Sequence, residues 1–138
     1  MKRVVLDESA LLAFLWDYPG ASDVEELLNR ALLGQVIVFV PMSAWSSVCS
    51  AVWRAKGKAS GEPLLRQLCQ LPLSFIELDH SGAQRAAELA EESDVSVLMS
   101  FAAAIACQRK ATLITAERIP QSLSRQVRVQ NIEGAGKD

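Results

Sequence analysis

The sequence predicts a three-layer α/β/α domain, in which a five-stranded, mostly parallel sheet lies between two layers of helices. Short apolar, β-branched runs such as 36–40 have the composition of parallel strands covered on both faces. They alternate with segments of helical periodicity, which is the order that builds a parallel sheet with helices on both sides. With 138 residues, 50% of them hydrophobic, the chain suits one such domain with its own core.

Five segments are predicted as strands. The first two are short apolar runs, the next two have the look of further strands, and the last alternates between apolar and polar residues, which is typical of a strand at a sheet edge. In chain order they are 4–6, 36–40, 73–78, 112–115 and 127–132. The polar, glycine-containing segment 133–138 is predicted to be a frayed tail, so residues 1–132 form the single domain.

The helices predicted between these strands begin at capping residues. Ser22 with Glu25, and Ser81 with Gln84, have the spacing of a capping box, in which two side chains each accept from a backbone N–H that the helix leaves unpaired. The helix over 98–109 is nearly all apolar, so we expect it to be buried. The other predicted helices are 9–16, 22–33, 43–56, 62–70 and 81–92.

Composition excludes some classes of protein. The chain has three cysteines, an odd number, and they are scattered among apolar neighbours: Cys49, Cys69 and Cys107. We therefore expect reduced core thiols and no disulfide framework. No apolar stretch is long enough to span a bilayer, and the N-terminus reaches Asp7 too soon for a signal peptide, which predicts a cytoplasmic protein. The net charge of -2 gives no support for tight, nonspecific coating of nucleic acid. It does not exclude an enzyme that contacts a few phosphates beside an acidic, metal-binding site.

Acidic side chains follow two of the predicted strands. Asp7 comes directly after the first strand, and Glu117 follows the fourth. The carboxyl ends of parallel strands share one edge of the sheet, where ligands of such folds bind. Taken alone, Asp7 is explained as well by capping the next helix, and Glu117 by a solvated loop. The two acids carry a functional interpretation only together with the rest of the chain.

Three segments resemble the PIN domain family, and within it the VapC-type ribonuclease toxins. They are 4–13, where a strand ends in Asp followed two residues later by Ser, 16–21 with its Pro-Gly turn, and 113–117, which is similar to a late strand ending in Thr-Ala-Asp. The resemblance runs from about residue 3 to about residue 132. No single motif is specific, and their order and spacing carry the resemblance.

The resemblance implies a metal-dependent ribonuclease, whose pattern has four acids that hold Mg or Mn. Such ions activate water and stabilise the leaving oxygen of a phosphodiester, and they prefer hard oxygen ligands. Asp7 matches the first acid, and Glu117 matches the fourth, where the family has Asp. Both are therefore expected catalytic and metal-binding positions. Ser9 and Thr115 supply the accompanying hydroxyls.

The other two acid positions carry no acid in this chain. The second, in the helix after the second strand, matches Ser47, and the third, at the start of the buried helix, matches Met99. A thioether is a soft ligand that does not suit Mg or Mn. We expect Glu8 to point away from Asp7, and Asp94 would need a rearranged helix start, so neither is expected to replace a lost ligand.

The sequence therefore predicts a VapC-type protein with an incomplete metal site. We expect weak Mg or Mn binding, little or no nuclease activity, a homodimer, and function through binding a small antitoxin protein or RNA. One alternative is an active Mg- or Mn-dependent endoribonuclease toxin of a toxin-antitoxin pair, with an unrecognised acid. Another is a receiver-like phosphoacceptor module that uses Asp79, although Lys110 precedes the fourth strand, where such a module needs a lysine after a strand.

Other candidate groups have simpler explanations. His80 is the only histidine, and we expect Asp79 or Ser81 to cap the helix that it enters. Trp45 and Trp53 share one helix face with Cys49, which indicates core packing, or alternatively a subunit interface. The basic run 54–58 could meet RNA, although it also suits an ordinary helix C-terminus.

Overall fold

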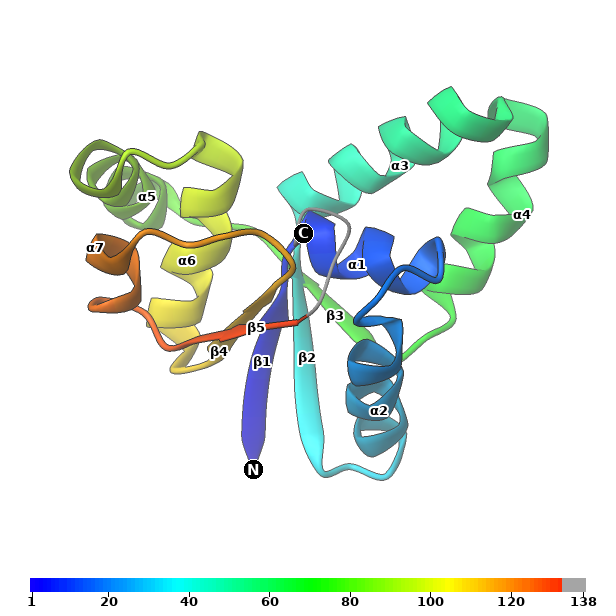
Figure 1. Ribbon diagram of the computed structural model, residues 1–138, viewed down its shortest axis with the longest axis horizontal. Coiled ribbons are helices and arrows are strands. Elements are labelled where there is room, and N and C mark those ends of the chain that lie inside the picture. Colours follow the sequence, from blue (N-terminus) through cyan, green and yellow to red (C-terminus); the bar gives the residue numbers. More distant parts are fainter. Residues whose placement is uncertain (133–138) are drawn as a thin grey trace.

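The computed structural model describes residues 1–132, which fold into a five-stranded sheet between two layers of helices (Figure 1). All strand pairs are parallel, and the strand order is β3-β2-β1-β4-β5. The predicted fold class is confirmed, and β5 lies at the sheet edge as expected. The strands are β1 (Lys2–Leu6), β2 (Val36–Pro41), β3 (Leu73–Ile76), β4 (Thr112–Thr115) and β5 (Val129–Asn131).

The helices form two layers. In Figure 1, α1 to α4 lie on one side of the sheet and α5 to α7 on the other. Successive residues of β1 serve the two sides, because Val4 and Leu6 join the core under α1 to α4, whereas Val5 joins the core under α5 to α7. This explains why the central strands are apolar throughout. The helices are α1 (Glu8–Leu15), α2 (Ala21–Leu32), α3 (Met42–Lys56), α4 (Lys58–Cys69), α5 (His80–Ser93), α6 (Val97–Arg109) and α7 (Gln121–Ser124).

Both predicted capping boxes are wrong. Helix α2 begins one residue before Ser22, because Gly20 turns the chain into the helix with a left-handed φ of 100° and no side chain caps it. At α5, Asp79 takes the cap position, and its Oδ1 accepts from the backbone N–H of Gly82 at 2.8 Å. The proposed cap by Asp79 is confirmed, and His80 is the exposed first residue of the helix.

Helix α4 begins four residues before the predicted start. Gly57, with φ of 79°, ends α3 and lets the chain reverse at once into α4. The two helices then pack closely, since a Cβ on Gly61 would lie 2.9 Å from Cγ1 of Val52. Pro63 therefore lies inside α4 instead of opening it, at the cost of one backbone donor in that helix.

The cysteines are free, and one of the three meets the expectation of a core thiol. Cys49 is half-buried and packs against the core under α1 to α4, whereas Cys69 and Cys107 are exposed because helical geometry turns them outward. Trp45 and Trp53 do pack against the core under α1 to α4, and the Trp45 ring meets the ring of Phe75 at 5.2 Å.

Two further expectations concern membrane-spanning segments and the C-terminal tail. Within residues 1–132, no helix is long and apolar enough to cross a membrane. The predicted frayed tail, 133–138, lies outside the described residues.

Candidate functional site

The sheet brings the ends of β1 and β4 together. These strands are neighbours, although the chain visits β2 and β3 between them, and the backbone N–H of Asp7 donates to the carbonyl of Ile114 at 3.3 Å. The strand order reverses at this point, where open α/β sheets commonly bind ligands. Asp7, Ser9, Thr115 and Glu117 therefore lie around one place at the carboxyl edge, as the sequence predicts for the two strand ends.

Asp7 uses one carboxylate oxygen in a structural role and leaves the other without a partner among the described residues. Its Oδ1 accepts from the Ser9 hydroxyl at 2.7 Å and from the backbone N–H of Ala10 at 2.9 Å, so it caps α1. The residue is only 3% exposed, and its Oδ2 has no hydrogen-bond partner within residues 1–132. A buried carboxylate oxygen without a partner is costly, and this oxygen suits a cation or a donor that comes from outside the chain.

Hydroxyl groups tie Asp7 to the end of β4. The backbone N–H of Ala116 donates to Ser9 Oγ at 2.8 Å, and Ser9 Oγ lies 3.2 Å from Oγ1 of the fully buried Thr115. Thr115 Oγ1 accepts from the backbone N–H of Glu117 at 3.1 Å. The accompanying hydroxyls therefore hold the β4–α7 segment against the start of α1.

Asn131 is a site residue that the sequence analysis missed. Its Nδ2 donates to the backbone carbonyl of Glu117 at 2.6 Å, and so fixes the turn that carries this acid. The only signal in the sequence is an amide side chain near the end of an edge strand, which by itself does not distinguish a turn clamp from a solvated surface residue.

The two acids share one electrostatic environment. Burial raises the pKa of Asp7 above its ordinary value, and the nearby Thr115 hydroxyl, together with hydrogen bonds from Ser9 and the backbone N–H of Ala10, offsets part of that rise. Partial burial raises the pKa of Glu117, and the negative charges of Asp7 and Glu8 raise it further. Both carboxylates would be stabilised by a nearby cation.

The two predicted positions without acids lie on α3 and α6, one helix on each side of the sheet. Ser47 is half-buried on α3, one turn after Ser43. Met99 is 5% exposed in the first turn of α6, where its backbone N–H donates to the capping Ser96 Oγ at 3.1 Å. Asp94 is exposed and ends α5 in a left-handed conformation, with φ of 52°.

The donors present suit a divalent ion only in part. The carboxylates of Asp7 and Glu117 and the two neighbouring hydroxyls are hard oxygen donors, and Asp7 Oδ2 lacks a hydrogen-bond partner within the described part of the chain. These donors fit one weakly held Mg or Mn ion. However, residues 1–132 contain no group of three or more His, Cys, Asp or Glu side chains placed to hold a metal. This donor set does not fit the tight metal site of the four-acid pattern.

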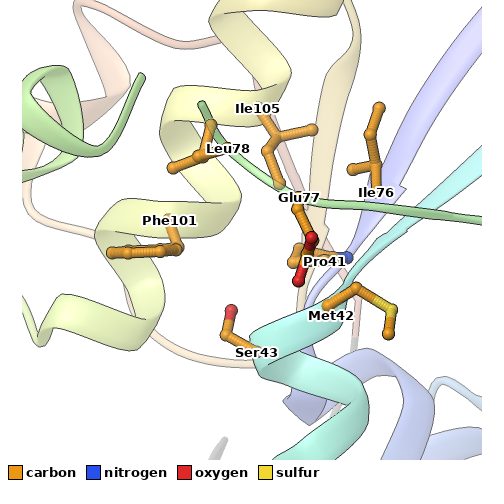
Figure 2. A pocket seen from close by; sticks show the side chains of 8 residues that line it. All are labelled: Pro41, Met42, Ser43, Ile76, Glu77, Leu78, Phe101 and Ile105. Atoms are coloured by element: carbon orange, nitrogen blue, oxygen red, sulfur yellow. The ribbon is translucent and has the colours of Figure 1, made fainter. Parts of the chain in front are cut away.

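A separate pocket lies at the carboxyl ends of β2 and β3. Figure 2 shows its walls, which come from the start of α3, the segment after β3, and α6. Its volume is about 400 Å³, and its polar groups are the carboxylate of Glu77 and Ser43 Oγ, which is buried without a hydrogen-bond partner in the described structure. Its lining excludes Asp7 and Glu117, and comprises Pro41, Met42, Ser43, Ile76, Glu77, Leu78, Phe101 and Ile105.

Comparison with known families identifies the fold. The model of the PIN domain matches residues 4–125. The chain belongs to the PIN domain family. This assignment agrees with the resemblance found in the sequence, and PIN domains typically use divalent metals. No curated protein matches the sequence closely enough to count as a relative.

Solved structures similar to this PIN domain include VapBC toxin-antitoxin proteins. VapBC2 from Rickettsia felis, bound to a promoter DNA fragment, is 15% identical with a TM-score of 0.72, covering 95% of this chain and 99% of that one. DNA-bound VapBC from Salmonella typhimurium is 14% identical with a TM-score of 0.71, covering 95% and 98%. VapC20 from Mycobacterium tuberculosis, a sarcin-ricin loop cleaving toxin, is 12% identical with a TM-score of 0.57, covering 80% and 86%. At these identities the likeness shows a shared fold.

Replacement of Asp7 by Asn should weaken the dependence of the free energy of unfolding on pH in the acid range. Because the pKa of Asp7 is raised in the folded state, protonation favours folding: the contribution is complete below the ordinary value of 3.8 and is lost as pH rises through the raised pKa. Each pKa unit of that rise corresponds to about 1.4 kcal/mol in the free energy of unfolding. Asn keeps an oxygen to cap α1, so the variant should match or exceed the parent's stability at neutral pH.

Urea unfolding of both proteins from pH 3 to pH 8 measures this effect. A parent that gains stability relative to the Asn variant as pH rises would contradict the raised pKa of Asp7.

Proposed function

We propose that this PIN domain is a VapC-type protein with an incomplete metal site, which is weak or inactive as a nuclease and acts through binding a protein partner or RNA. The observation that carries the proposal is the pairing of a retained Asp7, with an unpartnered Oδ2, and a buried Met99 at the position where the family pattern has an acid. The cytoplasmic location remains a prediction.

The alternative is an active Mg- or Mn-dependent endoribonuclease. The pKa values of Asp7 and Glu117 are both raised, and such paired acids are typical of functional sites. Hydrolysis of a labelled RNA by the parent protein, with manganese and with EDTA, decides between the two. Manganese-dependent cleavage that Asp7→Asn abolishes would establish the active enzyme and overturn our proposal.

The receiver-like alternative receives no support from the structure. The Oδ1 of Asp79 is already occupied in capping α5. Lys110 ends α6 just before β4 begins, so it lies at the opposite edge of the sheet from the strand ends that carry Asp7 and Glu117.

Manganese should bind weakly, with a dissociation constant in the millimolar range. Asp7 and Glu117 supply two negative charges where the full pattern supplies four, and each lost carboxylate removes both a ligand and a charge. Calorimetric titration of the parent with manganese measures this, with Asp7→Asn as the control that should show no binding. Tight, stoichiometric binding by the parent would reveal ligands that we have not recognised.

We also propose that the protein forms a homodimer and binds a small antitoxin. The similar structures from Rickettsia felis and Salmonella typhimurium are VapBC assemblies, and the helix that carries Trp45 and Trp53 keeps both rings only half-buried. Light scattering at micromolar concentration should give twice the chain mass of 15.0 kDa. A monomer at every accessible concentration would contradict the dimer.

A further inference from the structure

Basic side chains gather at the amino edge of the sheet, opposite the acidic site. Arg3 precedes the buried part of β1, and its guanidinium donates to the backbone carbonyl of Arg109 at 3.1 Å. Lys110 follows Arg109 at the end of α6, and a pocket of about 340 Å³ joins Lys110 to Arg128. These four residues, together with Lys2, are here called the basic edge, and all five are exposed. In Figure 1 the N-terminus, where this edge begins, lies at the bottom.

The net charge of the chain does not reveal that basic side chains gather at one edge of the sheet. Residues 1–6 contain two cations and no acid, and 95–132 contain five cations and a single acid, Glu117, which lies with its neighbour Arg118 at the opposite edge. The net charge is nevertheless -2, because the acids concentrate elsewhere along the chain. The cations of 95–132 are Arg109, Lys110, Arg118, Arg125 and Arg128.

The folded chain makes little internal use of these charges. Within residues 1–132 the ion pairs join Arg85 to two glutamates of α5, and none involves the basic edge. The negative end of the α6 dipole is already covered in part, because Arg3 donates to the carbonyl of Arg109. The guanidinium of Arg109 lies 5.4 Å from the ring centre of Phe39, whereas the charges of Lys110 and Arg128 face solvent around a concave surface.

The basic run that the sequence offered for RNA contact differs in this respect. The Nζ of Lys58 lies 5.0 Å from the ring centre of Trp53, and the Nζ of Lys56 lies 5.8 Å from that of Trp16. These are cation–π distances, so both ammonium groups already have partners within the domain. This run therefore supplies a matched control for Lys110 and Arg128.

We propose that the basic edge binds the phosphate groups of a single-stranded nucleic acid. Guanidinium and ammonium groups recognise phosphate oxygens, and the pocket between Lys110 and Arg128 adds the amide nitrogen of Gln126 as a donor, while its Oε1 accepts from Arg85 at 2.7 Å. Arg3 and Arg109 extend the positive surface beyond the pocket, which suits a strand with successive phosphates better than an isolated anion. This inference rests on the RNA-binding part of the proposed function and deepens it by naming a surface, which is remote from Asp7 and requires neither metal nor cleavage.

The test is binding of a labelled oligouridylate by fluorescence anisotropy, with EDTA present so that metal binding and cleavage do not contribute. The parent is compared with Lys110→Gln/Arg128→Gln and with the control Lys56→Gln/Lys58→Gln. The first variant should bind about tenfold more weakly, and the slope of log affinity against log salt should fall by about 0.7 for each phosphate that the variant no longer neutralises. The control should keep the parent's affinity and slope.

Inorganic pyrophosphate serves as the second arm of the experiment. As a competitor at equal phosphate concentration it should displace the oligouridylate poorly, because it spans fewer cations than the strand. Equal binding of RNA by the parent and the Lys110→Gln/Arg128→Gln variant would overturn the proposal. Complete displacement by pyrophosphate would also overturn it, and would leave a site for small anions. Neither result changes the manganese titration, so failure of this surface is distinguishable from failure of the proposed incomplete metal site.

Discussion

Ser47→Glu combined with Met99→Asp should create strong metal-dependent RNA cleavage, where the proposed function expects weak or no cleavage by the parent. The two changes place carboxylates at the two positions of the family pattern that carry no acid in this chain. Because ligands of one metal site act together, each single change should give much less than the pair. Hydrolysis of a labelled RNA with manganese, compared across the parent, both single variants and the double variant, measures the gain.

The same double variant should be less stable than the parent when no metal is present. Met99 is 5% exposed in the first turn of α6 and packs with the core under α5 to α7, so a carboxylate there loses both packing and hydration. We expect a loss of about 3 kcal/mol. Manganese should recover much of this loss, because an ion that binds only the folded state favours it. Thermal melts with manganese and with EDTA measure both effects.

A matched control places the same charges where no site is expected. Ser50→Glu with Val97→Asp adds two acids to the same two helices, at exposed positions. This control should show neither cleavage nor stabilisation by manganese. A repaired variant that behaves like the control would mean that Ser47 and Met99 do not face Asp7 and Glu117, and robust cleavage by the parent would mean that its site was never incomplete.

The fold was predictable because its signals are local and repeated. Apolar runs such as 36–40 can bury the side chains of both faces only between two layers of helices. The helices predicted between these runs supply those layers, so few other folds fit the sequence. The ends of elements were less predictable, since more than one residue could start a helix. Gly20 and Asp79 begin α2 and α5 in place of Ser22 and Ser81, through backbone conformation in the first case and a competing carboxylate in the second.

The candidate site was predictable where its residues stand at the carboxyl ends of predicted parallel strands. Asp7 and Ser9 are two residues apart, so their hydrogen bond follows from local sequence. Asn131 and the basic edge were missed because they depend on strand order. Arg3 and Arg109 are 106 residues apart, and they meet only because β1 pairs with β4. In a parallel sheet, charges at strand beginnings gather at one edge just as acids at strand ends gather at the other.

Ser9→Ala should destabilise the protein by about 2 kcal/mol, although it removes a single oxygen. Ser9 Oγ donates to Asp7 Oδ1 at 2.7 Å and accepts from the backbone N–H of Ala116 at 2.8 Å. Its loss leaves a backbone donor at the site without a partner, and it removes a hydrogen bond that lowers the pKa of Asp7. The pKa of Asp7 should therefore rise further in the variant, and the loss of stability should grow from acid toward neutral pH.

Urea unfolding at acid and neutral pH, with two comparison variants, tests this role of the Ser9 hydroxyl. Ser9→Thr keeps the hydroxyl and should retain most of the stability. Ser124→Ala removes a hydroxyl that donates to the carbonyl of Gln121 at 3.0 Å on the exposed α7, and it should change stability by about 0.5 kcal/mol or less. If Ser9→Ala is no more harmful than Ser124→Ala, then the hydroxyls do not couple the two strand ends. Asp7 and Glu117 would in that case be neighbours held by the sheet alone, with no preformed site between them.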